Sequence, residues 1–183
     1  DLARFRVVKD ADQFVSTLER SCEQAMPEDF WAITLPNDLA TSSPVSPSLY
    51  AYHASQVLLD AKALFSNHKV SYLLDPTSRG IKTAVDRHHL FPKGYLNKLG
   101  ITEQRDTNQI GNITLVEWSD NIKISDQPPS EYLPALKSRF KEDELKQMYH
   151  WHALPDAWEQ MEYREFLEAR RIKIARVIQE AYQ

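Results

Sequence analysis

Prolines divide this chain into short segments, and this division limits the folds open to it. Ten prolines stand against only four glycines in 183 residues. Proline ends helices and stiffens the connections between them, whereas glycine-rich turns are typical of extended sheets. With 42% apolar and 26% charged residues, the chain can bury one sizeable core and is not a disordered segment. We therefore expect helices joined by rigid turns.

Apolar spacing predicts the first of these helices. Phe14, Leu18 and Cys22 recur four positions apart and indicate a helix over residues 10–26, which a proline ends. Residues 27–46 contain three prolines and are expected to be irregular.

A second helix is expected to begin at Ser46, a residue type that caps helices, with Pro47 at the first helical position. We expect it to run to about Phe65 and to bury one apolar stripe. The residues of that stripe are Tyr50, Ala54, Val57, Leu58, Ala61, Leu64 and Phe65.

The C-terminal part of the chain also reads as helical. Ser130 follows two prolines and is expected to cap one helix, and residues 142–151 and 156–182 are expected to form two more. The apolar residues that we expect on one side of the last helix are Phe166, Leu167, Ile174, Val177 and Ile178.

Two short apolar segments, residues 84–90 and 113–118, are expected to be strands. The connection between them, residues 91–112, is long, and a short helix within it should close at Gly100. After the second strand, the segment that carries Asn121 is expected to be helical. Two strands followed by a helix form a compact β-β-α unit.

We therefore predict an α+β fold that is mainly helical, with the β-β-α unit embedded between helices. The expected parts are an N-terminal helical part (1–80), the β-β-α unit (81–130) and C-terminal helices (131–183), and we expect them to pack as one compact domain. The first residue is Asp1 rather than methionine, so we expect a fragment of a larger protein.

Charge is distributed unevenly along the chain. The net charge is −4, which argues mildly against a general nucleic-acid binder. Between Arg79 and Arg105, however, six basic residues accompany only two acidic ones. This excess suits a local nucleic-acid site on an acidic body, and the alternative is a solvated polar loop.

A single cysteine, Cys22, excludes a disulfide within the chain and a cysteine-based zinc ribbon. No apolar run approaches the length of about 20 residues that spans a bilayer, and no signal peptide is visible. These observations favour a reducing cytoplasm.

Two adjacent histidines, His88 and His89, end the first predicted strand. Successive side chains on a strand point to opposite faces, so the two imidazoles can do separate jobs. One can bind a divalent cation while the other takes a proton from water. Asp86 shares a strand face with His88, so its carboxylate can bond to His88 or lie just outside the ligands of the metal. The alternative is a structural or surface pair.

The order His88, His89, Asn112, Asn121 resembles the site of HNH nucleases. The stretch from Asp86 to Tyr132 resembles the HNH domain of GmrSD-type restriction endonucleases and their relatives. Its motifs are His88-His89-Leu90-Phe91-Pro92-Lys93, Asn108-Gln109-Ile110-Gly111-Asn112-Ile113-Thr114-Leu115, and Asn121 followed by Lys123.

The chain is also similar to the HNH domain of RNA-guided CRISPR nucleases. There, too, two asparagines stand nine positions apart, as Asn112 and Asn121 do. That family carries aspartate at the position of His88. Residues 166–175 resemble the flanking helix of full-length GmrSD-like proteins.

The resemblance implies a role for each residue of the motif. His88 and Asn121 would be the metal ligands, and His89 would be the general base. Asn112 would not touch the metal, because its amide would bond backbone groups across the loop and hold His89 in place.

Two weak ligands do not make a structural zinc site, so the expected cofactor is Mg²⁺ or Mn²⁺. Arg87, Lys93 and Lys123 are candidates for contacts with phosphate.

The implied function is metal-dependent nicking of DNA by the effector module of a bacterial restriction or phage-defence protein. The implied partners are DNA and an N-terminal nucleotide-hydrolysing or sensor domain, and the implied location is the bacterial cytoplasm. Two alternatives stay open. One is an inactive domain of HNH shape that binds DNA or protein, and the other is an RNA-cleaving nuclease.

Other histidines and tryptophans are expected to be structural. His150 and His152 are two positions apart, which does not place them on a shared helical face, so we interpret them as packing or surface residues. Trp118, Trp151 and Trp158 are expected to belong to the core rather than to stack on bases.

Overall fold

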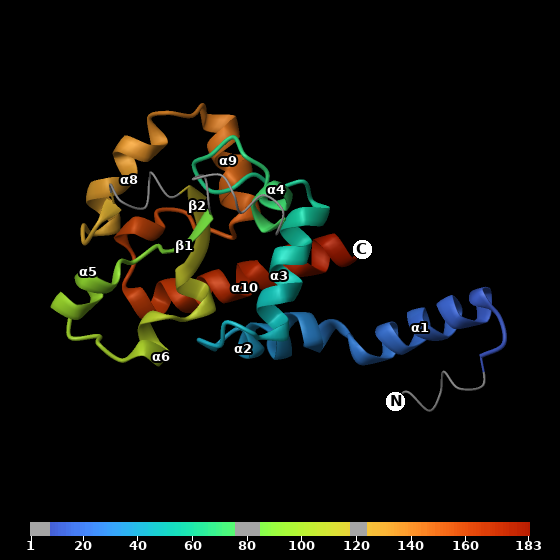
Figure 1. Cartoon of the computed structure of the whole chain (residues 1–183). Helices are drawn as coiled ribbons and strands as arrows, with labels where there is room; N and C mark the ends of the chain where they lie inside the picture. The colour runs from blue at the N-terminus through green and yellow to red at the C-terminus, as the bar shows by residue number, and fades with distance from the viewer. Residues whose placement is uncertain (1–7, 76–84, 118–123) are drawn as a thin grey trace.

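The computed structural model describes residues 8–75, 85–117 and 124–183, and it is mainly helical with one two-stranded antiparallel sheet (Figure 1). The first helical elements are α1 (Ala11–Ala25), the π-helix η2 (Phe30–Thr34), α2 (Leu35–Asp38), α3 (Pro47–Leu58) and α4 (Val70–Leu74). The hairpin comprises β1 (Val85–His89), α5 (Lys93–Lys98), α6 (Gln104–Thr107), the 3-10 turn η4 (Ile110–Asn112) and β2 (Ile113–Glu117). The last helices are α8 (Pro129–Lys137), α9 (Glu142–Trp151), the 3-10 turn η5 (Trp158–Gln160) and α10 (Tyr163–Tyr182).

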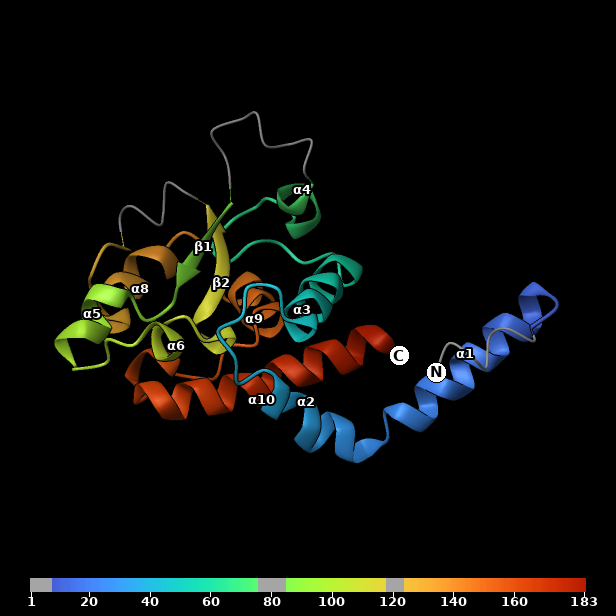
Figure 2. The ribbon, with the colours of Figure 1, turned by 60° about the horizontal axis from the view of Figure 1, so that its bottom comes forward.

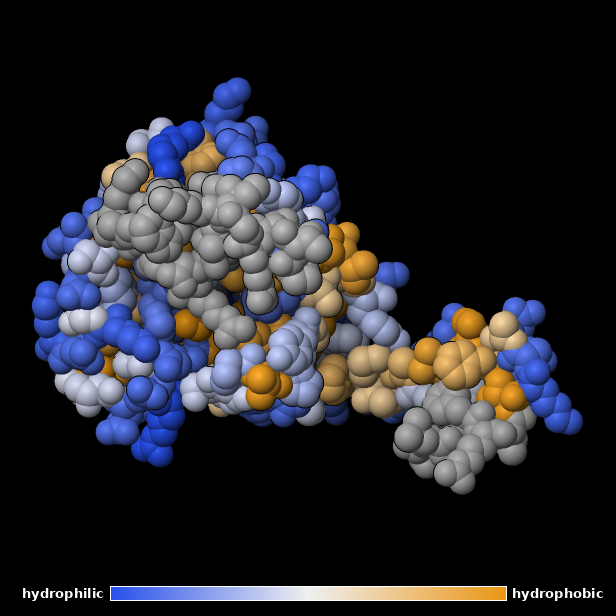
Figure 3. Space-filling view, in the orientation of Figure 1, coloured by the Kyte–Doolittle hydropathy of each residue, from blue (hydrophilic) through white to orange (hydrophobic). Residues whose placement is uncertain are grey.

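Helix α1 is confirmed, and the structure places it away from the main body of the molecule (Figure 1). Its N-cap is Asp10, whose carboxylate accepts a hydrogen bond from the backbone N–H of Gln13 at 2.8 Å. None of its residues is buried, and Phe14 and Leu18 are more than two-fifths exposed. Apolar side chains are therefore visible along this projecting arm (Figure 3).

The prediction of an irregular segment over residues 27–46 is wrong in part, because it contains η2 and α2. Pro36 occupies one of the first two positions of α2, where a helix does not need the backbone N–H that proline lacks.

Helix α3 begins after Ser46 as expected but ends at Leu58, so the predicted end at Phe65 is wrong. The chain turns at Asp60 and Phe65, whose φ angles are 54° and 56°. The predicted stripe is also wrong over the helix itself. Its members Tyr50, Val57 and Leu58 are exposed, and the residues that α3 buries are Leu49, Tyr52, Ser55 and Gln56.

Both predicted strands are confirmed within the described residues, and they pair in register from Val85 with Glu117 to His89 with Ile113. The loop between them is largely helical. Its first helix, α5, is followed by Gly100, whose φ of 81° suits glycine at the end of a helix.

The C-terminal helices differ from prediction mainly at their starts. Helix α9 is confirmed, whereas α8 begins at Pro129 and not after Ser130. Helix α10 begins only at Tyr163, because Ala157 adopts a left-handed conformation and Glu162 is the N-cap. The apolar side predicted for α10 is buried and is therefore confirmed.

Two large buried clusters form most of the core, and α1 contributes no buried residue to either of them. One cluster runs from Leu64 through Leu90 and Val116 to Leu167, and a second packs α10 against α2 and α3. Trp158 is fully buried, as predicted for a core residue. Figure 2 shows the two strands standing above α10, with α5 and α6 at one end of the ribbon.

Candidate active site

The two adjacent histidines lie on opposite faces of the two-stranded ribbon. His88 pairs with Thr114 and His89 with Ile113. Only 4% of the His88 surface is exposed, and its ring meets Tyr132 edge-on at 6.2 Å between ring centres. His89 is half-buried and lines a cavity together with Asn108 and Ser42. The two imidazoles are therefore in separate environments, as the alternation of a strand requires.

Asn112, which is fully buried, joins the two ends of the loop between the strands. Its amide oxygen accepts a hydrogen bond from the Phe91 backbone N–H at 2.8 Å. Its amide nitrogen donates to the carbonyl oxygens of Phe91 at 3.1 Å and Thr107 at 3.0 Å. The expected bonding of Asn112 to backbone groups across the loop is confirmed. These bonds fix the chain two residues beyond His89, and any contribution to catalysis stays a prediction.

His89 lines a cavity of about 240 Å³ beside the ribbon. Its Nε2 atom lies 2.9 Å from Oδ1 of Asn108. Because an amide oxygen only accepts hydrogen bonds, this contact requires a proton on Nε2 and leaves the lone pair of the neutral ring on Nδ1. Asn108 therefore orients the ring and selects its tautomer.

Sequence reasoning assigned no role to Asn108 or to Ser42 and Ser43, which form part of the same cavity wall. Asn108 is the first residue of the motif that contains Asn112, and that position was its only signal. The serines come from the segment between α2 and α3. A hydrogen bond of 2.9 Å from the Ile110 N–H to the Thr41 carbonyl oxygen holds this segment beside η4.

The remaining predicted site residues are only partly placed. Asn121 and Lys123 lie outside the described residues, as do the side chains of Asp86 and Arg87. Lys93 is exposed at the first position of α5.

A metal ion bound to His88 would need further ligands close to this ring. Its ring faces α8 through Tyr132, and α8 follows the segment that carries Asn121. Among the described residues, no three His, Cys, Asp or Glu side chains form a group that could hold a metal ion. An imidazole and an amide oxygen are ligand types that a Mg²⁺ or Mn²⁺ site completed by substrate and water accepts.

Arg170 of α10, which is fully buried, bonds the turn that carries Asn112. Its Nη1 donates to the carbonyl oxygens of Gly111 at 2.9 Å and Ile113 at 3.0 Å, and its Nε donates to that of His152 at 3.1 Å. Burial lowers the pKa of the guanidinium. Within the described ranges it has no carboxylate partner, so carbonyl dipoles compensate the buried charge. Helix α10 is thereby tied to both neighbours of Asn112.

His152 was interpreted as a packing or surface residue, and it is a fully buried packing residue with a complete set of polar partners. Its Nε2 donates to the Lys62 carbonyl oxygen at 2.8 Å. Its Nδ1 lies 2.9 Å from the Thr114 hydroxyl and 3.4 Å from the Gln56 amide nitrogen. Burial lowers the pKa of His152 to about 3, and the charge of Arg170 acts in the same direction. The imidazole is therefore neutral in the folded protein.

Acidification should destabilise the fold through His152. In the unfolded chain its pKa is about 6.5, whereas in the folded protein it is about 3. Between these values the unfolded state binds the extra proton, so the free energy of unfolding should fall by about 1.4 kcal/mol per pH unit. Urea unfolding at several pH values checks this slope, and His152→Gln should remove this contribution. The same slope in both proteins would count against it.

Comparison with known proteins does not place the chain in a family: no family model, curated protein or solved structure matches it. Within the described ranges, no helix combines the length and the apolar character needed to cross a bilayer.

Proposed function

We propose that this chain is a metal-dependent HNH endonuclease that hydrolyses DNA phosphodiester bonds one strand at a time. The observation that carries the proposal is the His88-His89 pair on opposite faces of a ribbon end that Asn112 bonds in place. In this proposal the chain is the effector module of a restriction or phage-defence protein. A nucleotide-hydrolysing or sensor domain would then be its partner.

The separate environments of the two rings allow them separate roles in the hydrolysis of a phosphodiester. His89 would take a proton from the attacking water, and His88 and Asn121 would hold the metal ion. When bound, the metal ion supplies positive charge that stabilises the phosphate and the leaving oxygen.

A general base must also be held in a fixed orientation, because small displacements of a reacting group reduce rates strongly. Asn108 bonds the His89 ring directly, at 2.9 Å. Asn112 acts one step further away, through the backbone of Phe91. Both are positioning residues in this proposal.

The protein should nick supercoiled plasmid DNA in the presence of Mg²⁺ or Mn²⁺ and stop when EDTA removes the ion. A single metal site cuts one strand at a time, so open circles should appear before linear DNA. Agarose electrophoresis separates the two products. Labelled DNA and RNA strands of the same sequence should show cleavage of the DNA alone.

Two results would favour the rival functions. DNA binding without nicks under any divalent ion would indicate an inactive domain of HNH shape. The near-complete burial of His88 against Tyr132 favours that rival, because a packed ring also stabilises the fold. Cleavage restricted to RNA would instead indicate an RNA nuclease.

A further inference from the structure

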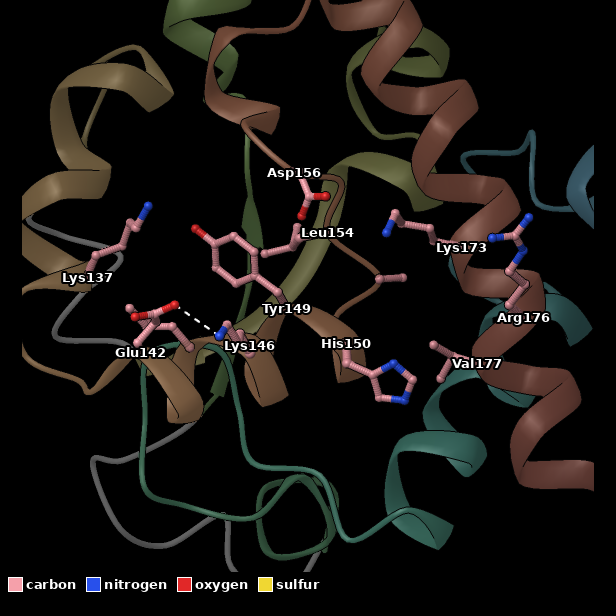
Figure 4. Close-up of a pocket in the computed structure, with 12 residues that line it drawn as sticks. Lys137, Glu142, Lys146, Tyr149, His150, Leu154, Asp156, Lys173, Arg176 and Val177 are labelled. Atoms are coloured by element: carbon pink, nitrogen blue, oxygen red, sulfur yellow. Dashed lines mark ion pairs between the residues drawn. The ribbon is translucent and has the colours of Figure 1, made fainter.

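A cavity of about 530 Å³ lies between α8, α9 and α10, and none of its lining residues belongs to the histidine site (Figure 4). Four cationic side chains line it, each from one of these three helices: Lys137, Lys146, Lys173 and Arg176. Glu142 and Asp156 are the carboxylates on its wall. The cavity is therefore locally positive, in a chain whose net charge is −4.

Most of this positive charge is not neutralised by ion pairs among the described residues. Lys146 pairs with Glu142 at 2.9 Å, and His150 pairs with Glu180 at 2.8 Å. For Lys137, Lys173 and Arg176, the described part of the chain offers no ion pair within 4.0 Å.

Two of these cations face the cavity from opposite sides. The ammonium groups of Lys137 and Lys173 point into it from α8 and from α10 (Figure 4). Lys137 also lies over the ring of Tyr149, 5.9 Å from its centre. An anion in the cavity would therefore be attracted by positive charge on both sides.

The rest of the lining is apolar. Leu145, Ala153, Leu154 and Val177 form this part of the wall, and the Tyr149 ring stands beside them. A cavity of this volume with apolar walls and a few convergent charges is typical of a site for a small organic ligand. Lysine ammonium groups act as point charges that suit phosphate.

We propose that this cavity binds an organic phosphate of about nucleotide size, with its phosphate held by the cationic side chains, Lys137 and Lys173 among them, and its organic part against the apolar wall. A long polyanion is the less suitable occupant, because the carboxylates of Glu142 and Asp156 border the cavity and the whole chain is acidic. The proposal does not depend on the nuclease activity.

Isothermal titration calorimetry on the whole chain tests the site, with inorganic phosphate, pyrophosphate and 5′-AMP as probes and adenosine as the uncharged comparison. We expect one AMP per chain, weaker binding of the two inorganic probes and no binding of adenosine. Lys137→Met and Lys173→Met should each raise the Kd for AMP at least about tenfold, because each removes a charged contact with phosphate.

Lys9→Met is the matched control, since it removes the same charge from an exposed residue far from the cavity lining. It should leave the Kd unchanged, and circular dichroism should show all three variants folded. Failure of all three phosphate probes to bind at millimolar concentration would overturn the proposal, as would equal effects of the three substitutions. Binding of a single-stranded oligonucleotide that depends on Lys173, without binding of AMP, would overturn it in favour of a contact with the nucleic-acid strand.

Discussion

Replacing Arg170 with methionine should lower the free energy of unfolding by about 3–5 kcal/mol, because three carbonyl oxygens lose a charged donor at about 1–3 kcal/mol each. Methionine fills much of the same volume but donates no hydrogen bond. The carbonyl oxygens of Gly111, Ile113 and His152 would then stay buried without the guanidinium donor that they have now. Urea unfolding followed by circular dichroism measures the change.

Arg164→Met is the matched control, because Arg164 is an exposed residue of the same helix. Its effect should stay within about 0.5 kcal/mol. A loss of less than about 1 kcal/mol for Arg170→Met would mean that the three carbonyl contacts contribute little to the fold. It would also mean that α10 does not hold the turn at Asn112.

Local sequence patterns predicted the elements whose signals lie within a few residues. The hairpin strands, α9 and the end of α5 at Gly100 were all correct. Apolar spacing also identified the buried side of α10. These elements follow from periodicity and from the conformational limits of single residues.

The predictions were wrong where contacts between residues far apart in the sequence determine the local structure. Gln56 is buried on α3 because its amide reaches the Trp151 carbonyl oxygen, 95 positions away, at 3.3 Å. Hydropathy cannot anticipate such a buried polar residue, so the predicted stripe was placed on the wrong face. The early end of α3 is followed by a left-handed conformation at Asp60, which aspartate adopts more often than most residues but which no neighbouring glycine or asparagine signals.

Only part of the candidate site could be predicted from the sequence. Alternation on a strand predicts opposite faces for His88 and His89, and the motif predicts the bonds of Asn112. The contact between His89 and Asn108 spans 19 positions, and Arg170 reaches Gly111 across 59. Both contacts depend on how α6, η4 and α10 pack, which no local pattern reveals.

Substitution of each histidine in turn should separate the two proposed jobs. His89→Ala should bind Mn²⁺ normally but nick DNA at least about 100-fold more slowly, because a positioned base contributes on that scale. His88→Ala should lose both properties. His88→Asp should recover Mn²⁺ binding and much of the activity, because a carboxylate oxygen is a good ligand for this ion. The exposed residue His150, replaced by alanine, is the matched control.

The most direct measurement is the Mn²⁺ affinity of the wild type, His88→Ala and His89→Ala, followed by electron paramagnetic resonance on proteins shown to be folded by circular dichroism. We predict that Mn²⁺ binds to the wild type and to His89→Ala with similar affinity, and that His88→Ala does not bind it. Undiminished binding by His88→Ala, or its loss in His89→Ala, would contradict the proposed division of labour between the two imidazoles.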